Sequence, residues 1–191
     1  GTYRYNEDGF AQYLNQVGMH YEDSLQHNIV QSISEDLDGN LWFISLSHAG
    51  ITKYDGNTFT QFMPEDGLSD DMYRSSYVDR KGHLWFGSNG NRKGGLDHFN
   101  GKTFNFFNEE DGICGKHIRA IFEDNEGNLW LGGQQNLCIY DGKSFQDFQS
   151  KEGETYDRIN FIVADADQGI WFGGAKGLWM FDGKQVIPYS K

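Results

Sequence analysis

Residues 123–133 read EDNEGNLWLGG, and similar stretches recur as EDLDGNLWFIS at 35–45, VDRKGHLWFGS at 78–88 and ADADQGIWFGG at 164–174. The tryptophans in these stretches are 43, 45 and 41 residues apart along the chain, and they are Trp42, Trp85, Trp130 and Trp171. A regular period of this length is typical of repeat architectures, in which each repeat is one small structural unit. The chain therefore consists of tandem units of similar structure.

Each unit contains the pattern of four short strands. A short run after each tryptophan ends in an aromatic residue followed by Asp-Gly or Asn-Gly, which is a hairpin signal between apolar runs. These turns fall at 54–56, 99–101, 140–142 and 181–183. The first strands of the units are expected at 29–35, 73–78, 118–123 and 159–164. Four short strands repeated in tandem predict an all-β protein, a β-propeller with four-stranded blades at about 25–63, 68–107, 113–148 and 155–189.

The N-terminus adds half a unit. Residues 1–13 (GTYRYNEDGFAQY) align without a gap on residues 50–62 (GITKYDGNTFTQF), which form the third and fourth strands of a blade. We therefore expect one propeller domain over 1–191, with four complete blades and an N-terminal half blade at 1–13. Because an open sheet edge leaves backbone groups unpaired, we expect either a piece of a longer propeller or an array that closes by self-association.

The composition narrows the possible partners. The 25 glycines, only 2 prolines and 16% aromatic residues favour short strands joined by tight turns. A formal charge of −12 disfavours binding to nucleic acid and direct contact with anionic membrane surfaces. No stretch has the roughly 20 apolar residues of a membrane span, and residues 1–13 do not resemble a signal peptide.

Most of the repeated residues have a structural explanation. The tryptophans are expected to fill the space between neighbouring sheets, with ligand stacking as the alternative. The turn at 36–39 resembles the start of a calcium loop but lacks the closing glutamate, so turn chemistry is the better explanation. Cys114 and Cys138 lack zinc-site spacing and are predicted two strands apart, which favours free thiols over a disulfide. No metal, cofactor or catalytic motif is predicted.

Candidate site residues are found where the repeats differ. The first strands of propeller blades line the central channel, and the loops leading into them form one of its mouths. Two neighbouring columns of the repeat alignment supply polar residues at this mouth: Gln31, Arg74, Arg119 and Asn160 in one, His117 and Arg158 in the other. Arginine offers a planar fork of donors to carboxylate or sulfate groups. The column therefore predicts a site for an oligosaccharide or a small anionic ligand.

An alternative is that these polar residues bind only water and one another, with the arginines neutralised by Asp70, Asp71 and Asp157. The six histidines occupy non-equivalent repeat positions, and a catalytic or metal site would need several of them to meet, for example His27 and His117 across the channel. The first loop has an insertion, LNQVGMHYE at 14–22, which is expected to expose Met19 and Tyr21. Such an insertion is either part of a binding face or a harmless extension.

The pattern ED-x-x-GNLW-[FL]-G, followed by YDG-x-x-F-x-x-F and DGL, resembles the two-component regulator propeller repeat over essentially the whole chain. This resemblance implies the periplasmic, extracytoplasmic sensor region of a hybrid two-component system. Such regions often sense oligosaccharides and adjoin further propellers or an immunoglobulin-like domain, ahead of a membrane span and a histidine kinase. We therefore expect a sensor for signal transduction that binds carbohydrate or a partner domain and performs no catalysis itself.

Two other functions remain open. One is a freestanding lectin-like or protein-interaction propeller. The other is an enzyme similar to the streptogramin lyases, which are propellers with related repeats and a metal cluster that includes a glutamate soon after Trp-Phe. The matching positions here hold no carboxylate: Ile44-Ser45, Gly87-Ser88, Gly132-Gly133 and Gly173-Gly174. This difference disfavours a metal-dependent lyase.

Overall fold

The structure is a computed structural model that describes residues 2–7, 9–13, 29–151 and 153–190. These residues form antiparallel sheets and two single-turn 3-10 helices, η1 (Pro64–Asp66) and η2 (Glu109–Asp111). The N-terminal hairpin consists of β1 (Thr2–Asn6) and β2 (Gly9–Tyr13). The first four-stranded sheet contains β3 (Val30–Glu35), β4 (Leu41–Ser45), β5 (Ile51–Tyr54) and β6 (Phe59–Phe62).

Three more sheets repeat this arrangement. The second contains β7 (Tyr73–Val78), β8 (Leu84–Ser88), β9 (Leu96–Phe99) and β10 (Phe104–Phe107). The third contains β11 (Ile118–Glu123), β12 (Leu129–Gly133), β13 (Leu137–Tyr140) and β14 (Phe145–Asp147). The fourth contains β15 (Ile159–Ala164), β16 (Ile170–Gly174), β17 (Gly177–Phe181) and β18 (Val186–Ser190).

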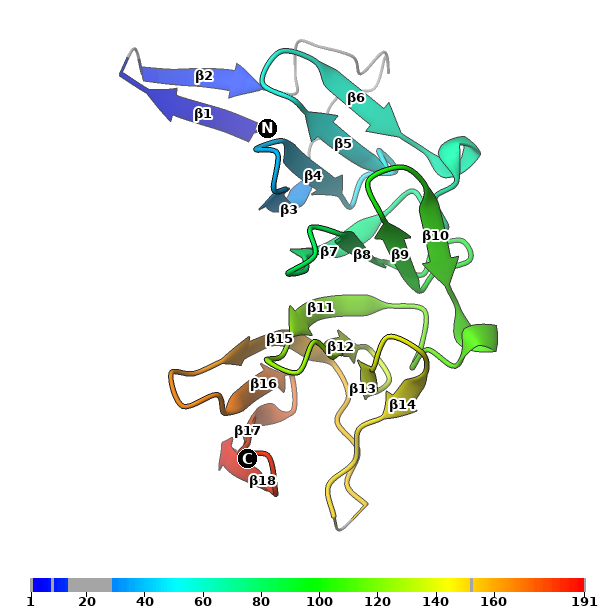
Figure 1. The fold of residues 1–191 in the computed structure, drawn as a ribbon, viewed down its shortest axis with the longest axis vertical. Coiled ribbons are helices and arrows are strands. Elements are labelled where there is room, and N and C mark those ends of the chain that lie inside the picture. The colour runs from blue at the N-terminus through cyan, green and yellow to red at the C-terminus, as the bar shows by residue number, and fades with distance from the viewer. Residues whose placement is uncertain (1, 8, 14–28, 152, 191) are drawn as a thin grey trace.

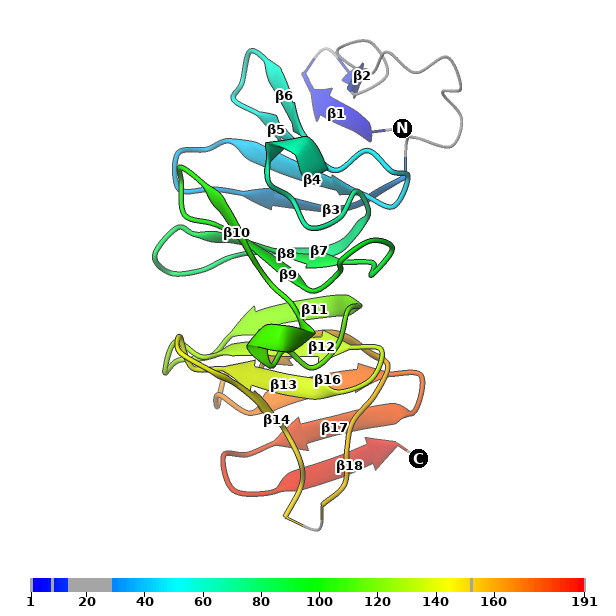
Figure 2. The same ribbon diagram turned by 90° about the vertical axis from the view of Figure 1, so that its right-hand side faces the viewer.

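The four sheets are propeller blades arranged in an open arc. Within each sheet the strands pair in chain order. The first strands β3, β7, β11 and β15 lie toward the inner side of the arc, whereas β6, β10 and β14 lie on its outer side (Figure 1). Figure 2 shows the sheets stacked face to face, with the first and fourth at opposite ends. The predicted all-β propeller, with four blades and a half blade, is confirmed, while the single-domain assignment stays a prediction.

The repeated tryptophans fill the junctions between blades. The Trp42 ring lies 5.7 Å from that of Phe62 in its own blade and 5.2 Å from that of Phe99 in the next. Trp85 and Trp130 make the equivalent contacts with Tyr140 and Phe181, at 5.9 Å and 5.7 Å. These large apolar side chains are almost fully buried, and such burial is the main stabilising contribution to stacked sheets.

An aspartate six residues before each tryptophan holds the indole in place. Asp124 Oδ1 accepts hydrogen bonds from the backbone N–H groups of Glu126 and Asn128, both at 2.9 Å. Its Oδ2 accepts a 2.9 Å bond from Trp130 Nε1. The other blades repeat the indole bond at 2.7–2.9 Å, in the pairs Asp36–Trp42, Asp79–Trp85 and Asp165–Trp171. Each aspartate thus closes its turn and orients its tryptophan, which explains its recurrence without a calcium ion.

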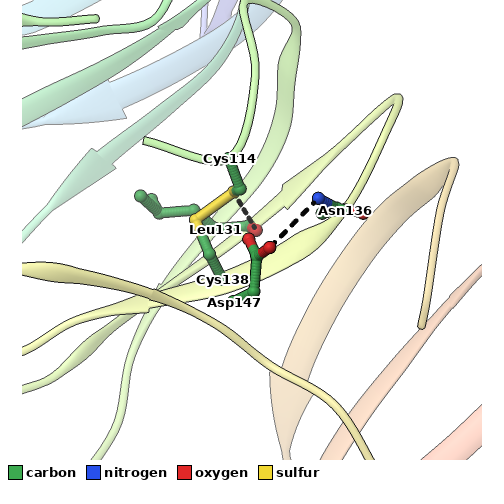
Figure 3. The surroundings of a disulfide bond; sticks show 5 residues. All are labelled: Cys114, Leu131, Asn136, Cys138 and Asp147. Carbon is green, nitrogen blue, oxygen red and sulfur yellow. Dashed lines mark hydrogen bonds between the residues drawn. A yellow bond between two sulfur atoms is a disulfide. The ribbon is translucent and has the colours of Figure 1, made fainter. Parts of the chain in front are cut away.

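The expectation of free thiols is wrong, because Cys114 and Cys138 form a disulfide with a Cα–Cα distance of 5.9 Å. Cys138 lies in β13, but Cys114 lies in no strand. It belongs to the segment that leaves η2 and crosses the third blade before β11 begins. Figure 3 shows Cys114 above this sheet, where its Sγ lies 3.9 Å from the Leu131 carbonyl oxygen. Counting strands therefore overstated the separation of the two cysteines.

Candidate functional site

The predicted polar column coincides with a β-bulge in every first strand. The pairing of β7 with β8 passes from Tyr73 opposite Ser88 to Ser75 opposite Gly87, which leaves Arg74 as the extra residue. The pairings of β3, β11 and β15 skip one residue at the same place. The four extra residues are Gln31, Arg74, Arg119 and Asn160. A bulge re-aims a side chain relative to the regular pleat, so the column is a structural feature as well as a sequence pattern.

Arg119 forms hydrogen bonds with residues of the third and the fourth blade. Its Nη1 donates to Asn160 Oδ1 at 3.2 Å, and its Nη2 donates to Gln134 Oε1 at 3.5 Å. Arg119 Nε is buried and has no hydrogen-bond partner among the described residues. A buried donor without a partner is costly, so the hydrogen-bonding capacity of Arg119 is not fully satisfied within the described chain.

Arg74 lies close enough to Arg119 for their charges to interact. Burial lowers the pKa of Arg74, and the neighbouring Arg119 charge lowers this pKa further. Arg74 Nε donates to the side-chain oxygen of Asn89, which follows β8. Within the described part of the chain, neither arginine forms an ion pair. Arginine side chains are positively charged in proteins, so this pair creates a local positive field in an acidic protein.

The expected counter-ions have other partners. Asp71 pairs with Arg92 at 2.9 Å and with His48 at 3.1 Å. Asp157 pairs with Lys176 at 2.8 Å. Asp70 is fully buried and accepts the backbone N–H of Asn91 at 2.8 Å. The alternative in which these three carboxylates neutralise Arg74 and Arg119 is therefore not the arrangement in the structure.

The other candidate residues surround this pair less directly. Gln31 holds the equivalent bulge in the first blade and is exposed. His117 is half-buried, and its backbone forms an isolated bridge with Asn89, the residue that accepts from Arg74. Arg158 is exposed, and its backbone N–H donates to the Gln134 carbonyl oxygen at 3.2 Å. His27 and the insertion with Met19 and Tyr21 lie outside the described residues, so their roles stay predictions.

The sequence reasoning missed two residues of this site, Asn89 and Gln134. Each follows the second strand of its blade, and both accept hydrogen bonds from the arginines. The repeat alignment contained a usable signal, because the aligned residues in the two blades without an arginine are Leu46 and Ala175. An amide thus occurs at this position only in the blades that have an arginine at the bulge.

The histidines do not gather at the candidate site. His83 Nδ1 and His98 Nε2 are 3.0 Å apart at the turn end of the second blade, and His48 contacts Asp71. Among the described residues, no three His, Cys, Asp or Glu side chains are grouped so that they could hold a metal ion. In the same part of the chain, no helix has the length and apolar character needed to cross a membrane.

Comparisons with known proteins agree with the repeat pattern. The family model described as "Two component regulator propeller" matches residues 67–90 and 112–135. The extracellular domain of a putative hybrid two component system from B. thetaiotaomicron is 23% identical, with a TM-score of 0.72 over 91% of this chain. The chain spans only 24% of that protein's length. No match was found among curated proteins.

Two further solved structures show how widely this fold is used. PorZ, a surface component of the type-IX secretion system of Porphyromonas gingivalis, is 18% identical, with a TM-score of 0.72 over 97% of this chain and 30% of that one. A catalytically inactive virginiamycin B lyase from Staphylococcus aureus is 12% identical, with a TM-score of 0.69 over 88% and 57% of the two chains. At these identities the likeness shows the fold alone, because one fold hosts many functions.

Proposed function

The chain carries two-component regulator propeller repeats, and from this premise we propose that it is a non-catalytic sensing module that binds an anionic ligand beside Arg74 and Arg119. The observation that carries the proposal is the adjacent pair of guanidinium groups, whose hydrogen bonds go to neutral amides. Burial lowers the pKa of Arg74 most, and the charge of Arg119 lowers it further, because two neighbouring cations without counter-ions repel each other. A bound anion would relieve this repulsion.

The ligand class follows from the groups at the site. Guanidinium groups suit carboxylate or sulfate, while the amides of Asn89, Gln134 and Asn160 suit hydroxyl groups. An oligosaccharide that contains a uronic acid offers both kinds of group. Since the whole chain has a charge of −12, attraction of an anion depends on the local field of the arginines rather than on the net charge.

The compartment and the partners are inferred from related proteins and from the disulfide. Solved proteins of similar fold include extracellular domains of putative hybrid two component systems. The Cys114–Cys138 disulfide is typical of an oxidising, extracytoplasmic environment. We infer that the chain works in the periplasm or outside the cell, packed against neighbouring propeller or immunoglobulin-like domains whose pose changes when ligand binds.

Calorimetric titration tests this function. The wild-type chain should bind a uronic-acid oligosaccharide more tightly than the neutral oligosaccharide of the same linkage, and added salt should weaken the binding. Arg119→Ala and Arg74→Ala should each weaken binding at least tenfold, since a charge-assisted hydrogen bond contributes about 1.5–3 kcal/mol. Arg80→Ala is the matched control, because Arg80 lies at the turn end of the second blade, beside Glu123. Equal affinity for the two oligosaccharides, or unchanged affinity in Arg119→Ala, would refute the proposed site.

A further inference from the structure

A cavity of about 400 Å³ lies between the third and fourth blades, at the turn ends of their strands. Its apolar wall includes Trp130, Ile139 and Phe181, and its rim includes the carboxylates of Glu126, Asp167 and Asp182. The bulges with the arginine site lie at the other end of the same first strands. The cavity is therefore a separate site from the one proposed above.

At the other two blade junctions, a side chain from the third strand lies over the tryptophan ring. At the first junction, the Lys53 ammonium lies 5.6 Å from the centre of the Trp42 ring. At the second, the His98 ring stacks on Trp85 with centroids 4.1 Å apart. Lys53, His98 and Ile139 hold the same register position, each directly opposite its blade's tryptophan. The first junction thus has an ammonium beside the indole, whereas burial and the neighbouring His83 lower the pKa of His98 at the second.

Ile139 gives the third junction a different side chain opposite its tryptophan. The side chain of isoleucine is shorter than that of lysine and carries no charge. No ammonium group at this position of β13 therefore lies over Trp130. The carboxylates around the rim remain, and the side chains of Glu126, Asp167 and Asp182 are all exposed. Asp124 contributes little to binding, because both its oxygens already accept bonds from the turn and the indole.

We propose that this cavity binds a small organic amine, with an alkyl stem along the apolar wall and an ammonium group near Trp130. The bound ammonium would occupy the place that the Lys53 side chain fills at the first junction. Aromatic faces attract cations, and carboxylates beside a partly desolvated cavity strengthen this attraction. The net charge of −12 favours the approach of a cation over that of an anion.

Titration with 1,5-diaminopentane, followed by calorimetry and by tryptophan fluorescence, tests the proposal. We expect one molecule to bind per chain, and the neutral analogue 1,5-pentanediol to bind at least tenfold more weakly. Asp167→Asn and Glu126→Gln should each weaken amine binding several-fold. Asp38→Asn is the matched control, since Asp38 holds the equivalent turn position at the first junction, where Lys53 already lies over Trp42.

Filling the cavity gives the sharpest test. Ile139→Lys should abolish amine binding by supplying the missing ammonium, and Ile139→Met should weaken it at least tenfold by occupying the space without a charge. Together these variants keep the test decisive if one of them folds poorly. The proposal is wrong if the diol binds as tightly as the diamine or if both filling variants retain wild-type affinity. It is also wrong if Asp38→Asn weakens binding as much as Asp167→Asn, which would indicate unspecific attraction to an acidic surface.

Discussion

Asp97 is a buried carboxyl group that joins three segments of the second blade. It lies in β9 with no exposed surface and accepts hydrogen bonds from the Ser69 backbone at 2.9 Å and the Ser69 hydroxyl at 2.5 Å. The Tyr73 hydroxyl donates a third bond, at 2.9 Å. Burial raises the pKa of Asp97 to about 6, although these hydrogen bonds act to lower the same pKa. The folded protein therefore holds a proton here at a pH where the unfolded chain does not.

This pKa predicts a pH-dependent stability. An unfolded aspartate has a pKa of about 3.9, so between about pH 4 and pH 6 the native state binds more protons than the unfolded state. The Asp97 contribution to stability is therefore largest below pH 4 and is lost as the pH rises through about 6. Over two pKa units this loss is about 3 kcal/mol. Urea unfolding at several pH values should show the decline in the wild type and a flatter profile in Asp97→Asn.

Asp55→Asn serves as the control for this measurement. Asp55 is exposed, and backbone hydrogen bonds from Thr58 and Asn57 lower its pKa to about 2. Its contribution to stability has the opposite sign and is lost only as the pH falls toward 2. A difference between wild type and Asp97→Asn that stays constant from pH 4 to pH 7 would contradict the raised pKa.

The bond between aspartate and indole in each blade predicts a second residue-scale effect. Asp124→Ala removes the acceptor of the Trp130 Nε1–H bond and of two backbone N–H groups in the turn. A hydrogen bond to a charged acceptor contributes about 1.5–3 kcal/mol, so the free energy of unfolding should fall by about 2 kcal/mol. Near-ultraviolet circular dichroism should also change as the indole loses its fixed orientation. Asp38→Ala changes an exposed aspartate in a similar turn and should leave both measurements almost unaltered.

The sequence predicted some site residues and not others for identifiable reasons. Arg74 and Arg119 were found because aligned repeats isolate the positions where side chains differ. The raised pKa of Asp97 was not predicted, because it results from complete burial under a segment that holds Ser69, 28 residues away. Strand patterns show which face a residue occupies but not which loop covers it.

At the scale of elements, the segments that cross from one blade to the next are each anchored at the same place. In the second blade, Ser69 on this segment bonds Asp97 in the third strand. In the third blade, Cys114 and Cys138 at the corresponding positions form the disulfide. In the fourth, the ring of Tyr156 on the segment lies 5.3 Å from that of Trp179 in the third strand. In these three blades, the crossing segment is held to the third strand by hydrogen bonds, by a disulfide and by an aromatic contact, respectively.

Removing the disulfide should destabilise the chain. The cysteines are 24 residues apart, and closing a loop of this size restricts the unfolded state by about 3 kcal/mol. Denaturation of the wild type with and without a reductant should show a loss of this order. The Cys114→Ser, Cys138→Ser double variant should match the reduced wild type and should not respond to reductant. Coincident unfolding curves for oxidised and reduced wild type would show that the anchor makes no net contribution.

The strands could be predicted from the sequence, whereas the path of the crossing segment could not. Hairpin turns and alternating apolar residues located each sheet, because local chemistry determines both. The position of Cys114 over β13 is a tertiary feature that depends on how the chain leaves η2 (Figure 3). A cysteine pair is therefore misjudged when one member lies outside the strands.

At the scale of the whole molecule, the two end blades present apolar side chains on their outward faces. Ile33 on β3 is 50% exposed, and Phe161 and Val163 on β15 are 46% and 50% exposed. On the opposite face of β3, Ser32 and Ser34 meet Ser76 of the second blade. Each outward face thus resembles one side of a blade junction, and the described residues do not form the other side.

These faces predict self-association of the isolated chain. Sedimentation velocity should show a mass that rises with protein concentration, because joining two such faces removes apolar surface from water. The Phe161→Glu, Val163→Lys double variant should shift the chain toward monomer with little change in its unfolding free energy. Leu37→Ser, at an exposed apolar residue in a turn, should leave association unchanged. A monomer at all concentrations would show that these faces do not pair with each other.

The number of blades follows from four tryptophans in register, since each marks one sheet. Whether and how the arc closes does not follow from any local pattern. It depends on surfaces such as Phe161 and Val163, which look like ordinary strand residues in the sequence.

The bulge in each first strand has a consequence for how such proteins diversify. Because Gln31, Arg74, Arg119 and Asn160 are the unpaired extra residues of their strands, a substitution there disturbs no opposite residue. These four positions can therefore change without shifting the sheet register. If ligand binds at the proposed site, its specificity can change through one substitution per blade, and the same four positions are the natural targets for engineering a receptor.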